Sequence, residues 1–132
     1  MNLDIFNQQY SQEYIVTEQV YQTFQQCSGD YNPLHTDETF AKSKGFPERV
    51  MYGNILNAFI SHFIGMVLPT QEVIIHSQEI YFRNPVFLND HLLLSAQVAN
   101  ISEMVNVVEF KFTFRKQDGK VVAKGNIQIG VI

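Results

Sequence analysis

An acid and an imidazole lie five residues apart in the stretch 24–41, which reads FQQCSGDYNPLHTDETFA. Asp30 stands before an Asn-Pro pair and His35 after it, so a turn could aim both side chains at one point. Histidine exchanges its proton near neutral pH, and a carboxylate beside it can share a bound water or act as a second acid or base. The pattern therefore predicts acid/base chemistry. The structural alternative is that Asp30 forms an Asx-turn with the amide of Tyr31 or Asn32, while His35 only covers a loop.

The elements that flank this stretch would position the pair. Thr17 is expected to cap a short helix over residues 17–27. The apolar residues on one face of that helix are Val20, Tyr21 and Phe24. The residue before a proline avoids the helical region, so Asn32-Pro33 predicts a turn or an extended backbone. Asp37 is expected to cap a second short helix.

Residues 53–67 predict the longest helix of the chain, because apolar side chains recur there at helical spacing. The residues of this stripe are Ile55, Leu56, Phe59, Ile60, Phe63, Ile64 and Val67. At ~1.5 Å per residue the helix would be about 22 Å long. The stripe is broad, so most of the helix should be buried.

Four later segments have the composition and alternation of β-strands: 73–83, 91–101, 106–116 and 120–132. In the third segment, one face would carry Val108, Phe110, Phe112 and Phe114. Asp118-Gly119 predicts a tight hairpin between the last two segments, and Asn89-Asp90 is expected to join the first two. A further strand should begin near Tyr14, and residues 1–12 are expected to be loosely held.

A long apolar helix followed by an antiparallel meander predicts an α+β fold, in a single domain over residues 1–132. The economical packing is an antiparallel sheet of five to six strands wrapped around one long central helix. Such an open sheet leaves edges exposed, and pairing across a two-fold axis would hide one of them. We therefore expect a homodimer, or a higher homo-oligomer built from it.

The charge and composition exclude several classes of partner. The formal charge is −4, and the nine Lys and Arg residues are scattered, so neither nucleic acid nor an anionic membrane would find a basic face. The longest apolar segment, 55–68, is interrupted by polar residues and too short to span a membrane. The N-terminus lacks a secretory signal, and the single Cys27 fits a reducing compartment. These features predict a cytoplasmic location.

The string Ser28-Gly29-Asp30-Tyr31-Asn32-Pro33-Leu34-His35, with Phe24 before it and Ala41 after it, resembles the signature of the MaoC-like hydratases. This family includes the (R)-specific enoyl-CoA hydratases, also called hydratase 2. Two later segments extend the resemblance: Val50 to Leu56, at the start of the predicted central helix, and Tyr81 to Phe87 with Asp90. The resemblance covers the chain from about Phe24 to its C-terminus.

The resemblance implies the hot-dog fold, usually a dimer with the substrate tunnel at its interface. It implies a hydro-lyase that adds water to an enoyl thioester or removes it from an (R)-3-hydroxyacyl thioester. Asp30 and His35 would hold the water, and the backbone N–H of Gly53 would bind the thioester oxygen as its negative charge develops. The substrate would be a thioester of coenzyme A or of an acyl carrier, and no metal or redox cofactor would be needed.

Four further positions are expected to bind or orient. Ser61 matches a family serine that orients the catalytic acid; alternatively, its hydroxyl bonds a backbone carbonyl of its own helix. Asn32 would fix the loop, and Ser28 would cap or orient it. Tyr52 stands beside the oxyanion glycine, where the family usually has a histidine, so it bears on substrate binding.

Two other functions stay open on the sequence. A hot-dog acyl thioesterase would need a carboxylate placed to help water attack the carbonyl, and the Asp-x-Asn-Pro-x-His loop disfavours that. A non-catalytic acyl-thioester-binding subunit would keep the fold without the chemistry. Asp30 and His35 argue against such a subunit, whereas Tyr52 in place of histidine keeps it open.

Overall fold

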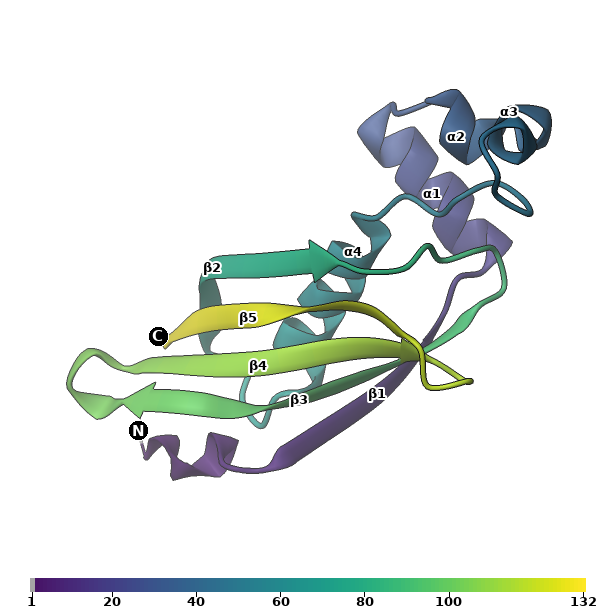
Figure 1. Cartoon of the computed structure of the whole chain (residues 1–132). Helices are drawn as coiled ribbons and strands as arrows, with labels where there is room; N and C mark the ends of the chain where they lie inside the picture. The colour runs from purple at the N-terminus through teal and green to yellow at the C-terminus, as the bar shows by residue number, and fades with distance from the viewer. Residues whose placement is uncertain (1) are drawn as a thin grey trace.

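The computed structural model describes residues 2–132 and contains one five-stranded antiparallel sheet (Figure 1). Its strands are β1 (Gln9–Ile15), β2 (Val73–Phe82), β3 (His91–Ser102), β4 (Val107–Lys116) and β5 (Val121–Val131). They lie in the order β1-β3-β4-β5-β2. The two edges of the sheet are therefore β1 and β2.

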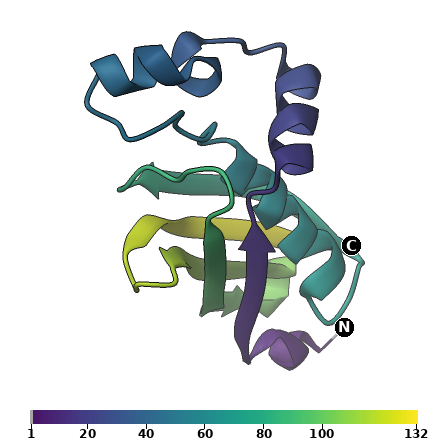
Figure 2. The same ribbon diagram turned by 90° about the vertical axis from the view of Figure 1, so that its right-hand side faces the viewer.

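The α-helices all lie between β1 and β2 in the chain: α1 (Glu18–Ser28), α2 (Pro33–Thr36), α3 (Glu38–Ser43) and α4 (Ile55–His62). Two 3-10 helices, η1 (Leu3–Phe6) and η3 (Glu103–Val105), and the π-helix η2 (Phe63–Val67) complete the structure. Helix α4 crosses one face of the sheet, whereas α1, α2 and α3 form a layer beyond one end of the sheet (Figure 2). None of the helices in residues 2–132 is long and apolar enough to cross a membrane.

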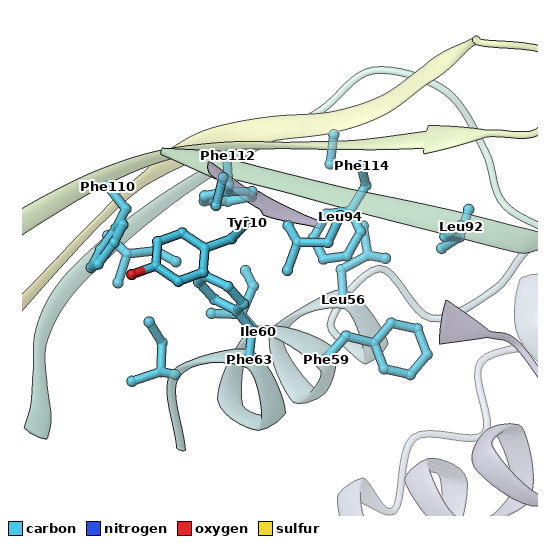
Figure 3. Packing of buried hydrophobic residues seen from close by; sticks show 14 of the residues in the cluster. Tyr10, Leu56, Phe59, Ile60, Phe63, Leu92, Leu94, Phe110, Phe112 and Phe114 are labelled. Carbon is cyan, nitrogen blue, oxygen red and sulfur yellow. The ribbon is translucent and has the colours of Figure 1, made fainter. Parts of the chain in front are cut away.

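The hydrophobic core lies between α4 and the face of the sheet turned toward it (Figure 3). The predicted row on β4 is at most 3% exposed: Val108, Phe110, Phe112 and Phe114. Phe63 meets Phe110 edge to face, with 6.2 Å between ring centroids. The predicted α+β fold, a sheet wrapped around one central helix, is confirmed.

The predicted helix over residues 53–67 is present, with one change of pitch. The chain turns at Gly53 and Asn54, continues as α4, and passes directly into the π-helix η2. Leu68 is extended, as the residue before a proline prefers, and ends the helical segment. The predicted apolar stripe is buried except for the partly exposed Val67.

The four predicted strands after the helix are present to within one residue at each end, but the prediction that all four form one meander is wrong. β2 and β3 do not pair across Asn89-Asp90; β2 pairs instead with β5 at the far edge. The intervening segment contains Pro85 and is held at the end of β1, because Asn89 N–H donates to the Val16 carbonyl at 2.7 Å. Only β3, β4 and β5 form a meander, with Gly119 (φ +88°) in the predicted tight turn between β4 and β5.

The expectation of a loosely held N-terminal segment is also corrected. Leu3 and Phe6 are fully buried, and Tyr10 donates a 2.9 Å hydrogen bond to the Phe6 carbonyl. Strand β1 begins at Gln9 rather than near Tyr14. These apolar anchors are spaced among polar residues, which is why composition alone suggested a mobile segment. Residue 1 lies outside the described residues.

Candidate active site

The loop between α1 and α2 is shaped by its own polar side chains. After α1 ends at Ser28, Gly29 adopts a left-handed conformation (φ +68°) that glycine tolerates without strain. Ser28 Oγ accepts a hydrogen bond from the Asp30 N–H at 3.1 Å. Asp30 Oδ1 in turn accepts from the Asn32 N–H at 3.0 Å. Asn32 Oδ1 then caps α2 by accepting from the Leu34 N–H at 2.9 Å.

Asp30 therefore makes the Asx-turn that the sequence left as an alternative. This turn uses only Oδ1, and Oδ2 accepts no hydrogen bond from any part of residues 2–132. The Asp30 side chain is exposed, so Oδ2 is free to meet a ligand. A structural role in the turn and a chemical role at the site are thus compatible.

His35 lies in α2 with its imidazole held by a backbone carbonyl. Its Nδ1 is 2.7 Å from the Val50 carbonyl oxygen. A carbonyl only accepts, so Nδ1 carries the proton in the neutral ring and Nε2 keeps a lone pair. The neutral imidazole can therefore accept a proton from a water molecule at Nε2.

Tyr21 of α1 bonds the backbone carbonyls of both His35 and Val50, a role that its place on the apolar face of the helix did not predict. Its hydroxyl lies 2.5 Å from the His35 carbonyl oxygen and 3.2 Å from that of Val50. The Tyr21 side chain is 1% exposed, and Arg49 lies over its ring at 5.0 Å. Burial raises the pKa of Tyr21 to about 12, so its hydroxyl is a donor at neutral pH. Residue spacing predicted the apolar face of α1, but it could not predict which groups the Tyr21 hydroxyl would contact.

Tyr52 lies between the two residues expected to be catalytic. Its hydroxyl donates to the Asp30 carbonyl oxygen at 2.5 Å, and its ring stacks on His35 with centroids 4.2 Å apart. It is 2% exposed and does not line the pocket that His35 lines. The structure thus brings Tyr52 into contact with Asp30 and His35 rather than with the space open to a substrate.

An apolar pocket of about 370 Å³ opens beside His35. It is lined by His35, Phe46, Val50, Met51, Gly53, Leu56, Phe82, Arg83, Asn84, Pro85 and Val86. The segment 82–86 forms one wall, and the Met51 N–H, which donates to the Val86 carbonyl at 2.8 Å, ties that wall to the start of α4. The pocket thus joins an imidazole from α2 to the turn before α4.

Gly53 contributes a backbone donor to this pocket. Within residues 2–132, its N–H makes no hydrogen bond, although its carbonyl accepts from the Leu56 N–H at 3.1 Å. A Cβ at this position would lie 3.1 Å from the Phe82 ring, so glycine leaves the space beside that ring open. A free N–H at a helix start is suited to stabilise negative charge on a bound oxygen.

Of the predicted site residues only His35 and Gly53 line the pocket; Asp30 lies outside its lining, as do Tyr52, Ser61, Asn32 and Ser28. Ser61 is exposed on α4 and makes no side-chain hydrogen bond to residues 2–132. Neither the predicted role in orienting Asp30 nor the alternative bond within the helix is therefore seen for Ser61. Asn32 and Ser28 are exposed, and their side chains accept hydrogen bonds from loop amides; a part for either in binding substrate stays a prediction.

A sheet wrapped around one central helix defines a hot-dog protein, and in this one an imidazole and the unbonded N–H of Gly53 share an apolar pocket. Comparison with known proteins agrees. The family described as MaoC like domain matches residues 6–118. This match covers most of the chain, so the chain belongs to the MaoC-like domain family, and the resemblance seen in the sequence is confirmed.

Two relatives and one solved structure illustrate the similarity. An (R)-specific enoyl-CoA hydratase of Aeromonas caviae is 28% identical over 102 residues, which cover 77% of this chain and 76% of that protein. A mitochondrial 3-hydroxyacyl-(acyl-carrier-protein) dehydratase of Arabidopsis thaliana is 30% identical over 77% of this chain and 62% of its own length. An unliganded R-hydratase from Pseudomonas aeruginosa has a TM-score of 0.86 and 32% identity, covering 95% of this chain and 80% of that one.

Proposed function

We propose that this chain is a hydro-lyase that adds water to an enoyl thioester, or removes it from an (R)-3-hydroxyacyl thioester. The names of the relatives support this class of reaction. The observation that carries the proposal is that His35, with Nε2 free to accept a proton, shares one pocket with the unbonded N–H of Gly53. A base for water and a donor for the thioester oxygen are the two groups that such an addition requires.

In the hydration direction, the oxygen of a water bonds to C3 while one of its protons passes to His35 Nε2. The electrons of the C2–C3 double bond move toward the thioester carbonyl, and Gly53 N–H stabilises the resulting negative oxygen. The proton that His35 has taken is then delivered to C2 by way of Asp30 Oδ2, so both residues end the cycle as they began it. One water is added in total, and dehydration follows the same steps in reverse.

We further propose that the thioester is carried by coenzyme A or an acyl carrier, and that the working unit is a homodimer. The pocket opens beside Phe82, which is 53% exposed on the edge strand β2, so a second copy there would close it. A partner would also satisfy the unpaired edge of the sheet. The cytoplasmic location and the absence of a required metal or redox cofactor stay predictions.

The test is hydration of crotonyl-CoA and of longer enoyl-CoAs, followed by loss of the near-ultraviolet absorbance of the conjugated thioester. The wild-type chain should hydrate them to the (R)-3-hydroxyacyl product. Asp30→Asn and His35→Ala should each lower kcat by about a hundredfold or more, the scale expected for an acid/base residue.

The chain offers matched controls for both variants. Asp118 makes the same kind of turn as Asp30, with its Oδ1 accepting from the Lys120 N–H at 2.8 Å, and His62 likewise uses Nδ1, toward the Tyr14 hydroxyl at 2.8 Å. Neither lines the pocket or bonds to His35 or to the loop that carries Asp30, so Asp118→Asn and His62→Ala should retain turnover. Full turnover in Asp30→Asn and His35→Ala would refute the proposal. Release of free thiol would favour a thioesterase, and binding without turnover a non-catalytic subunit.

A further inference from the structure

Tyr52 makes a contact that joins the two reactive residues to each other. Its hydroxyl reaches the Asp30 carbonyl across 22 residues of sequence, and the same ring lies against the His35 imidazole with 29° between the ring planes. No hydrogen bond within residues 2–132 links Asp30 to His35 directly. Their relative position therefore depends on the backbone between them and on Tyr52.

We propose that Tyr52 is a positioning residue that fixes Asp30 relative to His35, rather than a residue that binds substrate. The inference rests on the proposed acid/base function of the pair. It departs from the expectation that position 52 takes part in substrate binding. Tyr52 is 2% exposed and absent from the pocket wall, so it can influence the reaction only through the residues it contacts.

The hydroxyl of Tyr52 is the long-range restraint on the Asp30 loop. The other hydrogen bonds to residues 29–32 come from within residues 25–36: the three side-chain turns, the cap of α1, and short contacts from α2. Such bonds define the shape of the loop but not its place in the fold. The Tyr52 bond to the Asp30 carbonyl connects that loop to the chain just before α4.

The ring of Tyr52 is itself held firmly, which a positioning residue requires. Tyr21 and Phe24 of α1 pack against it with ring centroids 5.2 Å and 5.1 Å away. Burial, and next the negative charge of Asp30, raise the pKa of Tyr52, so its hydroxyl keeps its proton at neutral pH. The loop therefore meets a rigid donor in a fixed place.

The test compares Tyr52→Phe with Tyr10→Phe. Phenylalanine keeps the ring beside His35 and removes only the hydroxyl. Tyr10 is a matched control, since its hydroxyl also donates to a backbone carbonyl, that of Phe6, and Tyr10 does not line the pocket. Because small misplacements of a reacting group are costly, Tyr52→Phe should lower kcat by about tenfold or more, with KM changed by less than about threefold. Tyr10→Phe should retain kcat.

A double-mutant cycle separates positioning from general loss of stability. If Tyr52 acts through Asp30, adding Tyr52→Phe to Asp30→Asn should change kcat by less than about twofold, because there is no carboxylate left to position. An equal loss of kcat in both backgrounds would overturn the proposal. So would a Tyr52→Phe variant with the kcat of the wild type.

Amide hydrogen exchange gives a second readout that does not need turnover. Tyr52→Phe should speed exchange at the Asn32 and Leu34 amides, which donate to the loop turns, and Tyr10→Phe should not. If the wild type failed to hydrate enoyl-CoA but this exchange pattern appeared, the proposed function would fail while the role of Tyr52 in holding the loop stood. Unchanged exchange in Tyr52→Phe would refute the positioning role whatever the activity.

Discussion

At the residue scale, the polar side chains of residues 28–32 shape the loop, and one of them also has an atom left free for chemistry. Ser28, Asp30 and Asn32 each accept a hydrogen bond from the amide two residues further along the chain. Such local bonds let a short loop hold its shape without a core of its own. Asp30 uses one carboxylate oxygen in this turn and keeps the other free, so the Asx-turn fixes the position of the group proposed to transfer the proton.

The raised pKa of Tyr21 predicts how the free energy of unfolding depends on pH. Burial raises its pKa from 10.0 to about 12, so between these values the unfolded chain has lost the phenol proton that the folded chain keeps. The unfolded state then binds fewer protons, and the free energy of unfolding falls as the pH rises through this window, while below pH 10 the contribution is fully present.

We therefore expect Tyr21→Phe to lose less stability than the wild type between about pH 10 and about pH 12. Urea titrations followed by circular dichroism at several pH values across this range would measure the two slopes. Tyr14, whose pKa burial also raises to about 12, should leave a residual slope in the variant. Identical slopes for both proteins would contradict the assignment to Tyr21.

At the element scale, sequence predicted what depends on local pattern and missed what depends on distant contacts. The alternation that buries Phe110 and Phe114 belongs to β4 alone, and the cap of α1 by Thr17, which accepts from the Val20 N–H at 3.1 Å, is equally local. The pairing of β2 with β5, and the contacts of the Tyr21 and Tyr52 hydroxyls, join segments that only the folded core brings together. No spacing rule encodes them.

The turn before α4 contains Gly53, and substituting this residue tests whether its N–H takes part in the reaction. In Gly53→Ala, the added Cβ would lie 3.1 Å from the ring of the exposed Phe82, which can shift. Gly53 does not have a positive φ, so alanine fits the backbone, and the free energy of unfolding should change by less than about 1 kcal/mol. The new methyl group and the displaced ring should crowd the N–H, lowering kcat/KM by about tenfold or more.

Gly65→Ala is the matched control, since a Cβ at Gly65 meets nothing within 4 Å and that residue also lies in the helical segment. Its kcat/KM should stay that of the wild type. Urea unfolding and enoyl-CoA hydration measured on both variants check the pair. Unimpaired turnover in Gly53→Ala would argue against Gly53 N–H as the donor to the thioester oxygen.

At the scale of the whole molecule, the edge strand β2 is the least protected part of the sheet. Ile75 and Phe82 pair with the buried Ile129 and Ala123, so they point to the same side as the core, yet they are 36% and 53% exposed. Helix α4 is hydrogen-bonded to β2 through Asn57, whose Oδ1 accepts from the side-chain amide of Gln78 at 2.6 Å. An apolar edge of this kind invites pairing with another chain.

We expect this edge to be where two copies meet. Light scattering after gel filtration should give about twice the 15.2 kDa of a single chain. Ile75→Asp should shift the population toward monomer, because it places an unpaired charge where the second copy would exclude water. Leu93→Asp alters an equally exposed apolar residue, 38% exposed on the interior strand β3, and should stay dimeric. Since Phe82 and the pocket mouth lie on this same edge, loss of dimer should bring loss of turnover; a fully active Ile75→Asp monomer would show that one chain alone completes the site.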